Sequence, residues 1–231
     1  MWDCAELTDA IARGIAQAEE ALRREQAVLG LDARDEVSLH PLVAAGLGRL
    51  GLTVLREQAY PGAYARRPRP RDRERCDLVA LPPGADGLLD PLALLKRPEP
   101  TLFAAVEEPE PRPALPEDAF WLEVKSVAQV CYVEGVPMGN TSYASQLIRG
   151  PALDLAKLAR EPMIDAGGSL VLLFGASGDV VRHDLGVMTR ALIDRDLPIS
   201  SPSMDVVPIA DRAGNACVGV CLVPLRAVRD R

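Results

Sequence analysis

The chain has 231 residues, of which 48% are hydrophobic and 26% are charged. This balance is typical of a globular protein with one sizeable core, and it excludes wholesale disorder, collagen-like repeats and a bare coiled coil. The 26 basic and 33 acidic side chains give a formal charge of −7. Any binding to nucleic acid must therefore use a local basic patch rather than the whole surface.

The cysteines and the apolar segments indicate the compartment. The five cysteines are scattered and form no C-x-x-C pair, so neither a disulfide framework nor a zinc ribbon is predicted. The first residues, MWDCAELTDA, are acidic where a signal peptide needs basic residues. The longest apolar runs, 168–176 and 218–225, are too short to span a bilayer. We therefore expect a cytoplasmic protein without a membrane segment.

The first third of the chain changes from a helical period to a strand period. Residues 4–29 repeat apolar side chains in steps of three or four, which predicts an amphipathic helix. A second helix is expected to begin near Ser38, a good N-cap, and to end at Gly51. The alternation that follows predicts strands over 52–60 and 76–82.

The remaining elements follow a proline-rich stretch over 83–118, which is expected to run over the surface. The predicted order along the whole chain is α-α-β-β-β-α-β-α-β-β, which indicates one α/β domain over residues 1–231. The later elements are a strand over 119–130, a helix over 142–162 that Gly150 and Pro151 bend or break, a strand over 167–177, a helix over 184–195, and a C-terminal hairpin turning at 212–214.

The clearest candidate for chemistry is LEVK in the third strand. Glu123 and Lys125 lie two residues apart and therefore share one face of the strand. Burial of both charges is costly unless they pair or bind something. An ordinary ion pair at a sheet edge and a cross-strand salt bridge are two explanations. The third is a metal site with a catalytic lysine, because the chain uses 23 arginines and only three lysines, and a position that needs a compact ammonium must remain lysine.

Asp77 opens the preceding predicted strand. If the two strands are neighbours, Asp77 and Glu123 converge on one hard cation, which prefers oxygen ligands. The alternative is that Asp77 pairs with one of the arginines before it.

An aspartate at the start of one strand and E-V-K on the next, in this order of elements, resembles the PD-(D/E)XK nuclease superfamily. The similarity covers about residues 36–176. It implies a restriction-endonuclease-like core, α-β-β-β-α-β, with an extra N-terminal helix and a C-terminal β-hairpin. Cys76 stands where the family has proline, and the proline-rich insertion 83–118 is expected beside the site.

The resemblance also implies roles for individual residues. Asp77, Glu123 and the Val124 carbonyl would hold Mg²⁺ or Mn²⁺, and Lys125 would position the attacking water. The activity implied is metal-dependent hydrolysis of phosphodiester bonds, with DNA as the expected substrate. The alternative function is an inactive nuclease-fold module that binds nucleic acid or a protein.

Three further residues are candidate neighbours of this site. Glu36, at the start of the second helix, would add a catalytic carboxylate, or it is only an N-terminal charge that the helix dipole favours. His40 follows one turn later, and is either a site member or a partly buried structural residue. Gln146 lies in the helix after E-V-K, where related nucleases often keep a polar residue.

A basic loop precedes Asp77 directly. It is either a segment that binds phosphates beside the site, or a solvated loop in which two acidic residues partly offset the positive charge. We expect the phosphate-binding role, and a homodimer formed through the first helix and the terminal hairpin. The arginines expected to bind nucleic acid are Arg67, Arg69, Arg71, Arg73 and Arg75.

Overall fold

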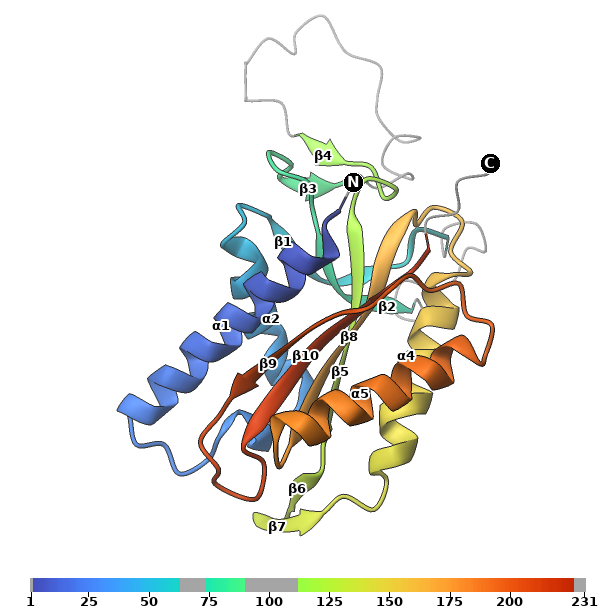
Figure 1. Cartoon of the computed structure of the whole chain (residues 1–231). Coiled ribbons are helices and arrows are strands. Elements are labelled where there is room, and N and C mark those ends of the chain that lie inside the picture. The colour runs from blue at the N-terminus through green and yellow to red at the C-terminus, as the bar shows by residue number, and fades with distance from the viewer. Residues whose placement is uncertain (1, 63–73, 90–111, 227–231) are drawn as a thin grey trace, which may run out of the picture.

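A six-stranded mixed sheet forms the centre of the protein (Figure 1). The computed structural model describes residues 2–62, 74–89 and 112–226. The strand order is β1-β2-β5-β8-β10-β9, and all neighbours are antiparallel except β5 and β8. The strands are β1 (Val54–Ala59), β2 (Arg75–Ala80), β5 (Phe120–Ala128), β8 (Ala166–Gly175), β9 (Ser203–Pro208) and β10 (Cys217–Pro224).

Helices cover both faces of this sheet, which confirms the α/β class (Figure 1). Leu170 and Leu172 of β8 pack in the cluster that contains the apolar residues of α1 and α2. Val171 and Leu173 point the other way and join the cluster under α4 and α5. The helices are α1 (Cys4–Arg24), the short 3-10 turn η1 (Leu31–Ala33), α2 (Glu36–Gly48), α4 (Tyr143–Leu158) and α5 (Gly178–Ile193).

The N-terminal helix α1 and the C-terminal hairpin of β9 and β10, which lie outside the expected core, contact each other within the chain. Helix α1 packs on α2, β9 and β10, and its Ile11 and Ile15 are fully buried there. The apolar face of α1 is therefore already covered by its own chain. None of the described helices combines the length and the apolar character needed to cross a bilayer.

Two small ribbons accompany the main sheet. Strands β3 (Gly87–Leu88) and β4 (Pro113–Ala114) pair in parallel at the described ends of the proline-rich insertion. Ala114 and Leu88 pack in the apolar cluster that contains Tyr60 and Trp121. The middle of the insertion lies outside the described residues. Strands β6 (Val130–Val133) and β7 (Val136–Gly139) form an antiparallel hairpin directly after β5, between the predicted strand and the next predicted helix, where no hairpin was expected.

Two predicted helix starts are wrong for the same physical reason. Helix α2 begins at Glu36 because Asp35 is the N-cap, and its carboxylate accepts a hydrogen bond from the Ser38 amide at 2.8 Å. Helix α5 begins at Gly178 rather than 184, with Ser177 as its N-cap. In both cases a capping side chain earlier in the sequence satisfies the free amides of the first turn.

Helix α4 is not broken at Gly150 and Pro151, one of the two outcomes predicted there, since it runs continuously from Tyr143 to Leu158. Packing of the helix on the sheet explains the glycine. A Cβ atom on Gly150 would lie 3.3 Å from Cδ of Lys125, so the missing side chain lets α4 pass directly over that lysine. Pro151 is buried in the same helix, and tertiary contacts offset the hydrogen bond that it cannot donate.

The crossing of α1 and α2 depends on Gly46. A Cβ atom there would lie 2.8 Å from backbone atoms of Ala10 and Ile11, which cannot move aside independently of α1. We expect Gly46→Ala to lower the free energy of unfolding by about 1–3 kcal/mol through overpacking. Gly48→Ala is the matched control, because its Cβ would meet nothing within 4 Å. It should instead raise stability by about 0.5–1 kcal/mol through helix propensity. Equal effects in urea denaturation would contradict this account.

Candidate functional site

Strands β2 and β5 separate at Asp77. Their pairing includes Ala80 with Phe120 and ends with Leu78 and Leu122. Beyond that point the Asp77 carboxylate replaces the backbone pairing, and its Oδ2 accepts a hydrogen bond from the Val124 amide at 2.8 Å. This bond fixes the carboxylate between the two strands and satisfies an amide that the diverging backbone leaves free. A charged, oriented oxygen pair thus lies at the opening of the sheet.

Lys125 is held beside this opening by two carboxylates. Its Nζ lies 3.2 Å from Oε1 of Glu36, 3.3 Å from Oδ2 of Asp154 and 3.0 Å from the Val124 carbonyl oxygen. The contact with Asp154 is an ion pair whose geometry does not meet that of a hydrogen bond. The second oxygen of Glu36 accepts from the Ser126 amide at 3.0 Å. The structure therefore brings Glu36 to Lys125.

The protonation state of Lys125 follows from these partners. Burial lowers the pKa of its ammonium group, but the nearby carboxylates of Asp154 and Glu36 outweigh burial and raise the pKa above its ordinary value. Lys125 is therefore a permanent positive charge at neutral pH. It is suited to donate hydrogen bonds or to stabilise negative charge, and not to act as a base.

Glu123 is paired with Lys157 and Tyr60. Its Oε1 lies 2.7 Å from Nζ of Lys157 and accepts a hydrogen bond from the Tyr60 hydroxyl. The glutamate side chain is only 3% exposed. Burial raises its pKa, against the opposing effect of Lys157 and Tyr60. The Lys157 ammonium also lies 4.9 Å from the centre of the Tyr60 ring, which stacks on Trp121. Glu123 is thus enclosed by its own chain.

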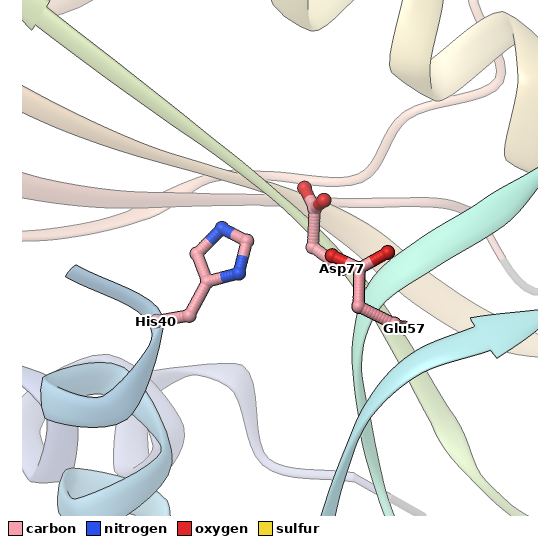
Figure 2. Close-up of side chains that lie close together, drawn as sticks. All are labelled: His40, Glu57 and Asp77. Atoms are coloured by element: carbon pink, nitrogen blue, oxygen red, sulfur yellow. The ribbon is translucent and has the colours of Figure 1, made fainter. Parts of the chain in front are cut away.

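A second group of possible ligands includes Asp77 (Figure 2). Side-chain donor atoms of His40, Glu57 and Asp77 all lie within 4.8 Å of one another, and among the described residues no other such trio occurs. The predicted set of Asp77, Glu123 and the Val124 carbonyl differs from it in two members. Asp77 belongs to both sets, whereas Glu123 is paired with Lys157 and the Val124 carbonyl accepts from Lys125.

The remaining predicted residues have other partners or lie outside the described residues. The amide oxygen of Gln146 accepts from Asn140 at 2.9 Å, and Asn140 also donates to the Ala128 carbonyl at the end of β5. Arg75 is exposed, and its guanidinium donates to the Glu57 carbonyl. The other four arginines expected to bind nucleic acid, Arg67, Arg69, Arg71 and Arg73, lie outside the described residues.

Four residues of the site were missed from the sequence, although two left a signal. Lys157 is one of only three lysines, so the argument made for Lys125 applies to it equally. Asp154 lies three residues earlier, on the same face of α4. Glu57 lies opposite Asp77 once the register of β1 and β2 is known. Tyr60 follows Ala59, the last residue of β1, and carried no signal of its own.

Among the side chains described here, carboxylates outnumber ammonium groups. The ion pairs and the ligand trio together hold two ammonium groups, from Lys125 and Lys157. The carboxylates number five: Glu36, Glu57, Asp77, Glu123 and Asp154. Such an excess favours binding of a cation, and hard or borderline divalent ions suit carboxylate and imidazole ligands.

Searches against protein-family models, curated proteins and solved structures find no match to this chain.

The pKa of Asp154 makes stability depend on pH. The pKa of Asp154 is raised from 3.8 to about 6, chiefly by burial. The positive charge of Lys125 opposes this increase, and the negative charge of Glu123 adds to it. A folded-state pKa above the unfolded value gives stability that is present below pH 3.8 and lost as pH rises through about 6. We expect the wild type to lose about 2–3 kcal/mol relative to Asp154→Asn between pH 4 and pH 7 without metal. Parallel urea-denaturation profiles of the two proteins would contradict this assignment.

Proposed function

We propose that this protein is a metal-dependent nuclease that hydrolyses phosphodiester bonds in DNA. The observation that carries the proposal is the Lys125 ammonium, held by Glu36 and Asp154 where β2 and β5 separate around Asp77. A cationic donor next to an oriented carboxylate is what hydrolysis of an anionic ester requires.

The order of elements supports the same proposal. Helix α2 is followed by β1, β2 and β5, which are successively antiparallel, and α4 then leads to β8, which is parallel to β5. This order is consistent with the α-β-β-β-α-β core that the resemblance to PD-(D/E)XK nucleases implies. E-V-K lies on the central strand of that unit, between Asp77 on one side and α4 on the other.

The residues present fit a divalent cation. Asp77 offers a carboxylate that its bond to the Val124 amide keeps in place, and the surrounding excess of acids favours a positive ion. When bound, Mg²⁺ or Mn²⁺ would supply Lewis acidity and lower the pKa of a coordinated water. Lys125 would donate hydrogen bonds to the attacking water or to the phosphate oxygens that gain negative charge. Asp154 and Glu36 would position its ammonium.

A cleavage assay tests the proposal. Single- and double-stranded DNA and RNA are incubated with the protein in Mg²⁺, Mn²⁺ or chelator, and Lys125→Ala is purified identically. We expect cleavage of DNA that requires metal and is lost in the variant. Cleavage that persists in the presence of chelator and also in the Lys125→Ala variant would refute the proposal. Binding of nucleic acid without any cleavage would instead favour the inactive nuclease-fold module.

A further inference from the structure

We propose that His40, Glu57 and Asp77 form the principal divalent cation site of this protein, with a preference for Mn²⁺ over Mg²⁺. The inference deepens the proposed function, because it names the ligands and the metal on which that activity would depend. It differs from the set of Asp77, Glu123 and Val124 that the family resemblance implies. Metal binding is measurable without any cleavage, so the two proposals can fail separately.

His40 is the first observation that points to a ligand. Its side chain is 1% exposed, and neither ring nitrogen has a hydrogen-bond partner. A buried polar group without a partner costs free energy, and natural proteins rarely leave one. Figure 2 shows the ring, from α2, turned toward the carboxylates of Asp77 on β2 and Glu57 on β1. A metal ion between them would accept the free lone pair of the imidazole.

The backbone at Glu57 is the second observation. Arg56 pairs with Leu78 and Gln58 with Cys76, which leaves Glu57 and Asp77 opposite each other as the only interior positions that do not pair in this ladder. Like charges at opposite positions of neighbouring strands destabilise a sheet. Glu57 also has a φ of 52°, a left-handed conformation that costs free energy for any residue except glycine. A shared cation would offset both costs.

The rival ligand set is already occupied by the chain. One oxygen of Glu123 contacts Lys157 at 2.7 Å and accepts from Tyr60, while the Val124 carbonyl accepts from Lys125 at 3.0 Å. Binding of an ion there would have to displace two ammonium groups from their partners. Glu57 is exposed at the strand surface, so the trio is open to solvent on one side and closed by the buried imidazole on the other.

The donor types select the metal. Mg²⁺ prefers oxygen ligands in a strict octahedron, whereas an imidazole nitrogen suits transition metals. Mn²⁺ accepts both carboxylate oxygen and imidazole nitrogen, and it resembles Mg²⁺ in its preference for oxygen. One nitrogen and two carboxylates therefore favour Mn²⁺ of these two ions.

The test is a titration of the full chain with MnCl₂ or MgCl₂ in the absence of nucleic acid, followed by electron paramagnetic resonance and calorimetry. We expect Mn²⁺ to bind more tightly than Mg²⁺ and to show nitrogen hyperfine coupling that disappears in His40→Leu. Glu57→Gln should weaken Mn²⁺ binding by about 10-fold to 100-fold or more, the loss already seen when only outer-shell partners of a metal are removed. Glu57 is exposed, so this variant stays informative if His40→Leu fails to fold.

Glu123→Gln is the matched control, because it also removes one carboxylate near Asp77. We expect it to change Mn²⁺ affinity less than Glu57→Gln does. The inference is overturned if Glu123→Gln abolishes binding while Glu57→Gln does not, if nitrogen coupling is absent, or if no Mn²⁺ binds. Mn²⁺ binding without cleavage of any substrate would keep this site and refute the nuclease. Metal-dependent cleavage together with normal Mn²⁺ binding in Glu57→Gln and His40→Leu would support the nuclease and refute this metal site.

Discussion

Replacing Lys125 with alanine is expected to lower the rate of DNA cleavage by about 10²-fold to 10³-fold, the usual loss when one preorganised donor to developing negative charge is removed. The effect should appear in kcat more than in KM, because the ammonium group acts on charge that grows in the transition state. Glu36 and Asp154 lose their shared partner in this variant, so its free energy of unfolding must be measured beside its activity.

Two further variants separate chemistry from charge. Lys125→Arg keeps the positive charge, but α4 passes over this side chain at Gly150, and a planar guanidinium cannot replace a compact ammonium there. We expect it to remain impaired. Arg160→Ala removes one exposed positive charge just after α4 and should leave the rate unchanged. A rate in Lys125→Ala equal to that of Arg160→Ala would remove Lys125 from the proposed chemistry.

Replacing Asp77 with asparagine is expected to lower cleavage by about 10³-fold, equivalent to about 4 kcal/mol of transition-state stabilisation, because a metal ligand is lost. The fold should survive, since the amide oxygen of asparagine can still accept from the Val124 amide. In the absence of metal this variant should be at least as stable as the wild type, because it removes the negative charge that lies opposite the Glu57 carboxylate.

Thermal unfolding with and without Mn²⁺ checks this prediction. An ion that binds only the folded state raises the melting temperature with concentration. The wild type should gain stability as Mn²⁺ is added, and Asp77→Asn should gain much less. An equal gain in both proteins would place the ion elsewhere, and full cleavage by Asp77→Asn would exclude Asp77 from the reaction.

Most of the fold could be predicted because its signals are local. The buried strand β8 was visible as a continuous apolar run, and α1 as a stripe of apolar residues at helical spacing. The errors arose where a distant contact outweighs local preference. Gly150 and Pro151 favour a break, yet packing of α4 over Lys125 keeps the helix intact.

The candidate site shows the same division. The rarity of lysine singled out Lys125, and the start of a helix singled out Glu36, which the structure places in contact. No sequence signal could assign the partner of Glu123, because Lys157 lies 34 residues later in the chain. The two side chains meet only after α4 folds onto β5.

The sequence by itself therefore determined the type and order of the main-sheet strands and of the four described α-helices, together with several of the side chains able to do chemistry, because periodicity and residue type are properties of short segments. The tertiary structure alone decided which of those side chains meet. The register of β1 against β2 sets Glu57 opposite Asp77, and the position of α2 brings His40 toward them. Strand register and helix placement are settled by packing across the whole core, so no local pattern specifies them.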